Sequence, residues 1–335
     1  MDLIYTDKNG IDVDMLPTYK LDMAYGRDEN NFEVTIAIED HCCEPECRIY
    51  MGDSDDGKNQ WTEIGGIIDA IKLNTESGDI TYSGRTWHGI MEGKVLCPDA
   101  GQDYLTLSGE ANTVLDTLIK RMNLEDMFEV SDVDSGIIIA SYQMDRYIAG
   151  YTGIRKMLKN ANAKLKMHYK EGKVEMQAIP LIDYSKDEEW DSTQISATVS
   201  KNDIPVNHII CLGKGELKER KVIHLFQDSR GNISKTQSYF GIQEITDIYD
   251  NANTESEQEL EEKGREKLED AYAAANSMEV TFKSNEIYDI GDYVGTTERY
   301  TGIKIREEIT KKIIKVNSND FCCCGCSWYY FPYVL

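Results

Sequence analysis

Apolar and polar residues alternate along much of the first hundred positions, and this period of two predicts β-strands. In residues 31–38, Glu33, Thr35 and Ala37 separate the apolar side chains, which is typical of a strand with one buried face. The apolar positions of that run are Phe32, Val34, Ile36 and Ile38. Two further runs, 65–74 and 79–87, flank the short segment 75–78, whose final glycine favours a hairpin turn. Residues 1–106 therefore predict a small β-barrel or sandwich.

A helical period of 3.6 residues replaces this alternation near position 108. Ser108 is the expected N-cap of one amphipathic helix, and Thr152 opens a second. The apolar stripes of the two helices are Val114, Leu115, Leu118, Ile119 and Met122, and then Ile154, Met157, Leu158 and Ala161. Residues 164–170 and 174–180 alternate again around a turn at 171–173, which predicts a hairpin. Residues 107–188 thus predict an α+β middle domain.

Strand patterns return after the acidic loop 185–191, in residues 194–200, 206–228 and 277–318. One long amphipathic helix interrupts them at 254–276, where Thr254 and Glu257 have the spacing of a capping box. Its apolar stripe is Leu260, Leu268, Ala271, Tyr272 and Ala275. We therefore predict an α+β, mainly β chain of three domains: a β-domain at 1–106, the middle domain at 107–188, and a second β-domain at 189–335 that carries the inserted helix.

Charge and composition narrow the function. The chain has 335 residues, with 60 acidic and 36 basic side chains and a formal charge of −24. This charge repels phosphate backbones and argues against nucleic-acid binding through a basic face. Charged residues interrupt every apolar stretch, and the opening sequence MDLIYTDKNG lacks the basic and apolar regions of a secretory signal. We expect a protein with no membrane-spanning helix, made in the cytoplasm.

Nine cysteines form an odd set without the regular spacing of a secreted disulfide framework, which favours a reducing compartment. Two groups of them have the ligand chemistry of a zinc site. The groups are His41, Cys42, Cys43 and Cys47, and Cys322, Cys323, Cys324 and Cys326. Neither group has two C-x-x-C pairs, and adjacent cysteines in a strand point to opposite faces. We predict no metal here and leave the role of both groups open.

Other candidate chemistry is equally weak. Asp53, Asp55 and Asp56 precede Gly57 as in a calcium loop, but the sixth and twelfth positions from Asp53 are lysine and isoleucine, so a solvated hairpin loop is favoured. The five histidines are expected at the surface or in loops, with His168 on the polar face of its strand. The common hydrolase and nucleotide motifs are missing. The sequence predicts no catalytic residue, cofactor or metal, and a protein that is not an enzyme.

The β-rich segments resemble known proteins. Residues 65–96 resemble the first hub-barrel motif of phage tail-hub proteins, with Gly84 and Arg85 at matching positions. Residues 206–233 and 288–314 are similar to the second barrel of the siphophage tail-hub family, which is related to the hub of contractile tails. The matching positions there are Gly213, Gly215, Glu216, Arg220, Gly231, Gly291, Asp292, Thr301 and Gly302. The resemblance covers most of the chain up to about Ser318.

This resemblance implies a structural baseplate hub with two β-barrel domains. Three copies would form a homotrimer whose barrels make a pseudo-hexameric ring, joining the sixfold tail tube to the tip around a channel for tape-measure protein and DNA. The implied partners are distal tail or tube proteins, tape-measure protein and tip or fibre proteins, with DNA only in transit. The implied location is the virion tail tip, after assembly in the bacterial cytoplasm. Larger hubs carry a C-terminal lysin or fibre-like extension, and this chain ends soon after the second barrel, so no hydrolase is implied.

Three alternatives stay open at this point. A contractile bacteriocin or another injection system would use the same hub fold. A tail-associated cell-wall hydrolase is an alternative of another class. A carbohydrate-binding module would need exposed aromatic platforms, for which Trp61, Trp87 and Trp190 are the candidates, although large aromatic residues are more often buried in a core.

Overall fold

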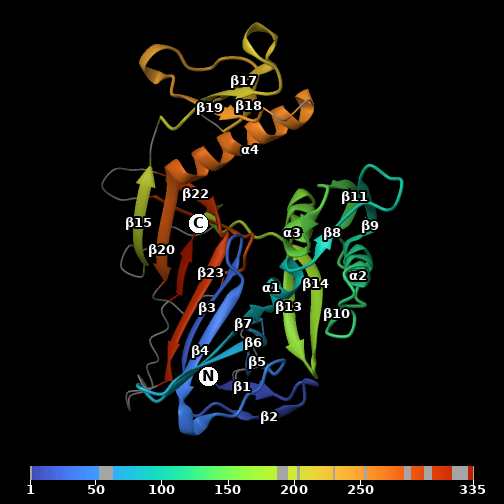
Figure 1. Cartoon of the computed structure of the whole chain (residues 1–335), viewed down its shortest axis with the longest axis vertical. Helices are drawn as coiled ribbons and strands as arrows, with labels where there is room; N and C mark the ends of the chain where they lie inside the picture. The colour runs from blue at the N-terminus through green and yellow to red at the C-terminus, as the bar shows by residue number, and fades with distance from the viewer. Residues whose placement is uncertain are drawn as a thin grey trace. The chain divides into compact units, whose positions relative to one another are not determined.

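The computed structural model describes residues 2–52, 63–186, 195–201, 204–228, 231–252, 254, 256–282, 288–297, 304–318 and 331–334. The chain divides into two compact units. Unit 1 contains Met1–Ser196 and Val280–Leu335, and unit 2 contains Ala197–Glu279 (Figure 1). The chain therefore leaves unit 1 once, forms unit 2, and returns.

One large sheet organises unit 1, although most residues of its strands β15 and β20 fall in the range of unit 2. From one end its strand order is β15-β20-β24-β23-β3-β4-β7-β6-β5-β1-β2. The strands are β1 (Leu3–Thr6), β2 (Asp12–Met15), β3 (Lys20–Gly26), β4 (Asn31–Ala37), β5 (Arg48–Met51), β6 (Gly65–Asn74), β7 (Asp79–Thr86), β15 (Ile195–Lys201), β20 (Asn276–Phe282), β23 (Lys311–Asn317) and β24 (Phe331–Val334). A strand near the C-terminus, β23, pairs antiparallel with β3 near the N-terminus. The mainly β class is confirmed, whereas the described strands form sheets with open ends, so the expected barrels are not confirmed.

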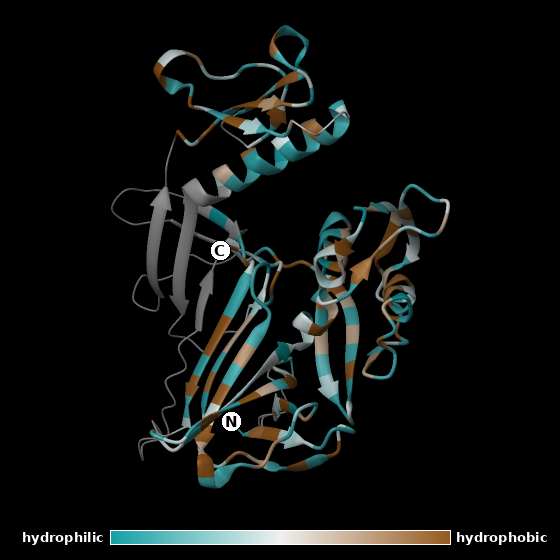
Figure 2. Cartoon of the chain, in the orientation of Figure 1, coloured by the Kyte–Doolittle hydropathy of each residue, from teal (hydrophilic) through white to brown (hydrophobic). Residues whose placement is uncertain are grey.

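The alternation of residues 31–38 has its expected result. Phe32, Val34 and Ile36 of β4 are buried, and Glu33 between them is exposed. Brown and teal alternate along these strands in Figure 2. The predicted hairpin is also present, because β6 and β7 pair from Asn74 and Asp79 outward. The buried face belongs to a core of twenty residues that includes Ile290, Ile314 and Val316 from the far end of the chain.

Helices and short sheets form a second layer of unit 1. The helices are α1 (Trp87–Glu92), α2 (Ala111–Arg121) and α3 (Gly150–Asn160). The strands are β8 (Val95–Leu96), β9 (Leu105–Glu110), β10 (Phe128–Val130), β11 (Ile138–Met144), β12 (Ile148–Ala149), β13 (Ala163–Lys170) and β14 (Lys173–Pro180). The hairpin β13–β14 turns at Glu171 and Gly172, both with positive φ. The predicted apolar stripes of α2 and α3 are buried in the second core of the unit.

Unit 2 is a four-stranded sheet covered on one face by a helix. The sheet order is β18-β17-β16-β19, and core residues of the sheet pack against Leu260 and Leu268 of the helix. The elements are β16 (His208–Leu212), β17 (Val222–Gln227), β18 (Ile233–Ser234), β19 (Thr246–Asp250) and α4 (Glu257–Ala275). A Cβ on Gly264 would lie 2.4 Å from the Cys211 sulfur, so glycine allows the helix to approach the sheet closely. The long amphipathic helix is thus confirmed.

The predicted caps of all three long helices are wrong. Ser108 lies inside β9, and Glu110 caps α2 by accepting from the Thr113 N–H at 2.8 Å. Thr152 lies inside α3 and donates from its N–H and its Oγ1 to Glu92. Helix α4 begins at Glu257, and the Ser256 Oγ accepts from the Glu259 N–H at 3.3 Å. The start of α3 depends on the distant Glu92 carboxylate, which leaves no trace in a short window of sequence, whereas α2 and α4 are capped locally, each two residues after the expected cap.

The remaining elements are short. The 3₁₀ turns are η1 (Ile38–Asp40), η2 (Tyr184–Lys186), η3 (Leu217–Glu219) and η4 (Gly241–Gln243). In unit 1, β21 (Tyr293–Thr297) pairs with β22 (Lys304–Glu308). No described helix has both the length and the apolar character required to span a bilayer.

Candidate functional site

A buried cluster of charged residues joins distant segments of unit 1. Its members, which we name the ionic cluster, are Glu63, His88, Lys164, Lys166, Asp289, Asp292 and Lys312. They come from the segment just before β6, from α1, from β13, from the segment before β21 and from β23. Segments that lie far apart in the sequence therefore meet in one electrostatic centre.

The ion pairs of this cluster form a connected network. The Lys164 Nζ lies 2.6 Å from Asp292 and 2.9 Å from Asp289. Lys166 lies 2.8 Å from Asp289 and 3.4 Å from Glu63. Lys312 completes the network at 3.5 Å from Asp289 and 3.9 Å from Glu63. Three ammonium groups thus face three carboxylates. This balance of charge offsets the free-energy cost of removing these groups from water.

The network sets the pKa values of its members. Burial by itself raises the pKa of Asp289, but the charges of Lys312, Lys166 and Lys164 outweigh burial and hold that pKa well below its usual value. The charge of Glu63, and that of Asp289 after it, raises the pKa of Lys166. Both groups stay ionised at neutral pH.

Asp292 of this cluster and the adjacent Gly291 are two of the positions at which the sequence resembles the tail-hub family. Gly291 has φ +97°, in the left-handed region that favours glycine, and a Cβ there would lie 3.0 Å from Leu181. The turn at Gly291 leads into Asp292, whose carboxylate accepts from the Ile182 N–H at 2.9 Å and from the Asp289 N–H at 3.2 Å. Asp292 therefore fixes backbone as well as charge. The positions Thr301 and Gly302 lie outside the described residues.

His88 corrects the expectation of surface histidines. Its ring is buried, stacked on Tyr25 at 4.6 Å and set edge-on to Tyr151 at 4.8 Å. Burial, together with the nearby charge of Lys312, lowers the pKa of His88 to about 3. The adjoining cavity is about 20 Å³, room for roughly one water molecule. A neutral, enclosed imidazole beside so small a cavity has a structural role.

His208 in unit 2 is a second buried histidine. Its Nδ1 lies 2.7 Å from a Glu244 carboxylate oxygen, and its Nε2 lies 2.9 Å from the Nδ1 of His224. The ring also stacks on Phe226 at 4.3 Å. His208 lies in an apolar run, and such a run indicates a buried position, although we expected a histidine at the surface or in a loop. His224, at the end of this chain of contacts, is exposed as expected.

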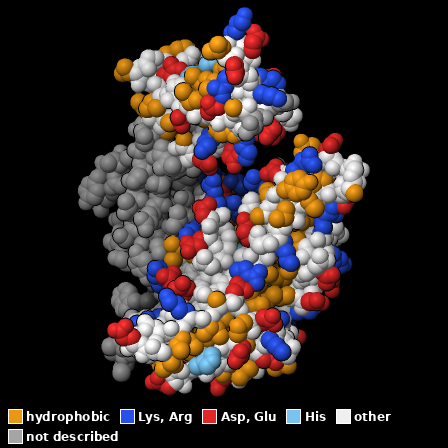
Figure 3. All heavy atoms as spheres, in the orientation of Figure 1, with side chains coloured by type: hydrophobic (Ala, Val, Ile, Leu, Met, Phe, Trp, Pro, Cys, Tyr) orange, Lys and Arg blue, Asp and Glu red, His pale blue; other side chains and the backbone are white. Residues whose placement is uncertain are grey.

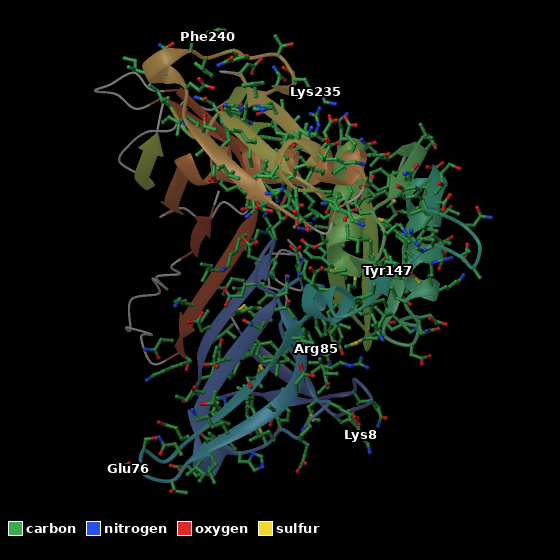
Figure 4. All side chains as sticks on the ribbon, turned by 45° about the horizontal axis from the view of Figure 1, so that its top comes forward. Lys8, Glu76, Arg85, Tyr147, Lys235 and Phe240 are labelled. Carbon is green, nitrogen blue, oxygen red and sulfur yellow. The ribbon has the colours of Figure 1, made fainter. Side chains whose placement is uncertain are left out.

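Gly84 and Arg85, where the sequence also resembles the tail-hub family, lie beside a β-bulge of unit 1. The register of β6 against β7 shifts between Ile68 and Ala70, and Asp69 at that shift accepts from the Arg85 Nε at 2.8 Å and from its Nη2 at 2.7 Å. A Cβ on Gly84 would lie 1.9 Å from the Ile67 carbonyl oxygen, so the close approach of the two strands requires glycine. Figure 4 shows Arg85 on this part of the sheet. These residues shape the strand pair.

The first cysteine group is held by Tyr82. The Tyr82 hydroxyl lies 2.8 Å from the His41 Nδ1 and accepts from the Cys42 N–H at 3.1 Å. Cys42 is exposed while Cys43 is buried, and their sulfurs are 3.6 Å apart. A hydrogen bond from Cys43 lowers the pKa of the Cys42 thiol. In the described part of the chain no three His, Cys, Asp or Glu side chains are grouped as metal ligands.

Several candidates lie outside the described residues. They are the cysteines at 322, 323, 324 and 326, the acidic loop at 53–57, and Trp61 and Trp190. Trp87 is described and fully buried, and it stacks on Tyr169 at 5.1 Å. It therefore packs in the core and is not a platform for carbohydrate.

Apolar side chains reach the surface in both units, as Figure 3 shows. In unit 1 they include Val13 and Met15 of β2, the end strand of the large sheet, and Ile11 directly before it. In unit 2 they include Leu217, Val222, Phe240, Ile242 and Ile248. Exposed apolar side chains along a sheet edge are typical of surfaces that contact another chain.

The fold is that of phage tail proteins. A 43 kDa tail protein of prophage MuSo2 from Shewanella oneidensis is similar with a TM-score of 0.55 and 11% identity over 100% of this chain and 98% of that chain. A tail protein from Neisseria meningitidis MC58 has a TM-score of 0.54 and 11% identity over 100% and 96% of the two chains. Prophage tail protein gp18 from Listeria monocytogenes EGD-e has a TM-score of 0.50 and 13% identity over 100% and 94%. No family model matches the chain, and no curated protein matches it either.

Proposed function

We propose that this protein is a structural subunit of a phage tail, built into the tip or baseplate as its hub. The observation that supports the proposal most strongly is the similarity of fold over the whole chain to tail proteins that it covers almost completely. The ionic cluster supports a structural role, because its charged groups pair with one another and thereby join distant segments of unit 1. In this proposal the protein is not an enzyme.

The proposed assembly is a homotrimer around a channel. Two hub-type barrels in each of three copies would match a sixfold tail tube, and the division 1–106, 107–188 and 189–335 remains a prediction of that arrangement. The open sheet supports it, since β2 at one end has an edge that a neighbouring chain can cover. The excess of 60 acidic over 36 basic residues suits a channel through which DNA passes without binding.

The proposed partners follow from this position. Tube or distal tail proteins would lie above the ring, tip or fibre proteins below it, and tape-measure protein inside it. The proposed location is the virion tail tip, with assembly in the bacterial cytoplasm. The hub of a contractile bacteriocin or another injection system would have the same partners in kind, and genes for sheath proteins beside this one would distinguish the two.

The test is the mass and shape of the purified full-length chain. Light scattering after size-exclusion chromatography should give about 114 kDa, three times 38.1 kDa, and negative-stain images should show rings. A monomer of 38.1 kDa at every concentration up to roughly 100 µM would overturn the proposal. A turbidity assay on bacterial cell walls tests the remaining alternative, because clearing by the purified protein would make it a hydrolase.

A further inference from the structure

The segment 213–221 of unit 2, here named the tip loop, holds an apolar side chain in solvent at a conformational cost. Leu217 is 94% exposed. Its φ is +49°, in the left-handed region that residues with a Cβ avoid. Exposure and strain are both unfavourable in an isolated subunit. A strained, exposed leucine is therefore a candidate contact residue.

Hydrogen bonds across the tip loop connect its two ends on either side of Leu217. Gly213 N–H donates to the Lys221 carbonyl at 2.8 Å, and Lys221 N–H donates to the Lys214 carbonyl at 3.1 Å. Arg220 donates from Nε to the Gly213 carbonyl at 3.0 Å and pairs with Asp250. A loop ordered before binding loses little conformational entropy when it docks.

The charge of the tip loop is opposite to that of the chain. It carries four basic residues and two acidic ones, a net +2 within a chain of −24. The basic residues are Lys214, Lys218, Arg220 and Lys221, and the acidic ones are Glu216 and Glu219. Lys218 is 90% exposed and has only a 3.9 Å contact with Glu219. A complementary surface should be apolar in its centre and acidic around it.

Strand β2 of unit 1 has these properties. Val13 and Met15 lie in β2 and Ile11 directly precedes it, and each is more than half exposed; these three apolar side chains are here named the β2 row. The register of β2 against β1 shifts at Val13, so the strand is bulged there. Asp12 and Asp14 alternate with them and are also exposed. As the end strand of its sheet, β2 has one edge without a neighbouring strand among the described residues.

We infer that the tip loop of one copy docks on the β2 row of the next, with Leu217 against Val13 and Met15 and with Lys218 facing Asp12 and Asp14. The inference rests on the proposed trimer and specifies one of its contacts. Each copy carries both surfaces and the two differ, so the contact is head-to-tail, and a head-to-tail contact can close into a ring. The occupant is a second copy of this chain, because the basic loop and the acidic strand complement each other.

The first test measures self-association of the full-length chain by sedimentation velocity across a dilution series. Leu217→Asn keeps a residue that accepts positive φ and should weaken assembly about tenfold or more, as expected for loss of a central apolar contact. Ile242→Asn is the matched control, since Ile242 is 97% exposed in the same unit. It should leave assembly unchanged.

Charge exchange provides the second arm of this test. Asp14→Lys and Lys218→Glu should each weaken assembly about fivefold, and the double variant should recover to within about twofold of the wild type, since complementary charges are restored. A wild-type trimer that none of these changes weakens overturns the contact and leaves the proposed function standing. A wild type that stays monomeric overturns both.

Cross-linking determines which chains touch. Equal amounts of ¹⁴N- and ¹⁵N-labelled protein are mixed, assembled and treated with a carbodiimide, which joins a carboxylate directly to an amine. The expected product links the peptide containing Asp12 and Asp14 to the peptide containing Lys218, with one light and one heavy partner. Products that are always uniformly light or heavy would place the contact within one chain and overturn the inference.

Discussion

Replacing Asp292 by asparagine is expected to destabilise unit 1 strongly. The Asp292 side chain is 0% exposed and its partner Lys164 is 3% exposed, so removing the negative charge leaves the three lysines of the ionic cluster against two carboxylates. Breaking a buried pair by removing one partner costs about 3–5 kcal/mol. With a urea m-value of about 3 kcal/mol/M, the midpoint should fall by more than about 1 M.

The assay is urea unfolding followed by tryptophan fluorescence and circular dichroism, since Trp87 is buried in unit 1. Asp22→Asn is the control, because the Asp22–Lys315 pair has a short 2.7 Å distance but both side chains are more than half exposed. Such a surface pair is worth less than about 1 kcal/mol.

A double variant tests whether the unpaired buried charge causes the loss of stability. Lys164→Met combined with Asp292→Asn removes one charge of each sign and leaves two lysines against two carboxylates, while the asparagine Oδ1 can still accept from the Ile182 N–H. Because no unpaired buried charge remains, the double variant should be more stable than Asp292→Asn alone. An Asp292→Asn loss below about 1 kcal/mol, or a double variant weaker than the single one, would contradict this view of the cluster.

Three further changes test other features of unit 1. His88→Phe should reduce the pH dependence of stability: the folded His88 pKa of about 3 lies below its ordinary 6.5, so the wild type loses stability as the pH falls from 6.5 towards 3, and thermal melts across this range should show a smaller loss in the variant. Glu110→Gln should cost about 1 kcal/mol of stability at pH 7, because glutamine is a weaker cap. Burial raises the pKa of Glu110, but hydrogen bonds, led by that from Ser135, lower it to about 2, so the wild type loses stability as the pH falls from 4.5 towards 2 and the variant should lose less. Equal slopes of stability against pH in the two proteins would contradict this. Gly84→Ala places a Cβ against backbone and should cost about 3 kcal/mol in urea unfolding, whereas Gly78→Ala, with open space and φ +73°, should cost about 1 kcal/mol; equal losses would refute the steric argument.

Local patterns predicted the elements well. The burial of Phe32 and Val34 follows from a period of two, and that of Ile154 and Leu158 from a period of 3.6. Each pattern depends only on neighbours in the sequence and on one buried face. The predicted start of α3 failed because the side chain of Thr152 binds a residue sixty positions away, whereas α2 and α4 begin at local caps, Glu110 and Ser256, two residues after the expected ones.

The ionic cluster could not be predicted for the same reason. Glu63 and Lys312 are separated by almost 250 residues, and a lone buried charge has no periodicity. Asp292 was noted only as a position shared with tail hubs, while its role depends on Lys164 from another element. His88 did carry a local signal, because it lies between Trp87 and Ile90 in an apolar stretch.

The path of the chain through unit 2 has a consequence for how such proteins diversify. The segment departs through β15 and comes back through β20, and these two strands are hydrogen-bonded neighbours. Since its two ends are adjacent, a short reverse turn is enough to reconnect them. The segment between β15 and β20 can therefore be lengthened, shortened or exchanged, in evolution or by design, while the strand register of the large sheet stays the same.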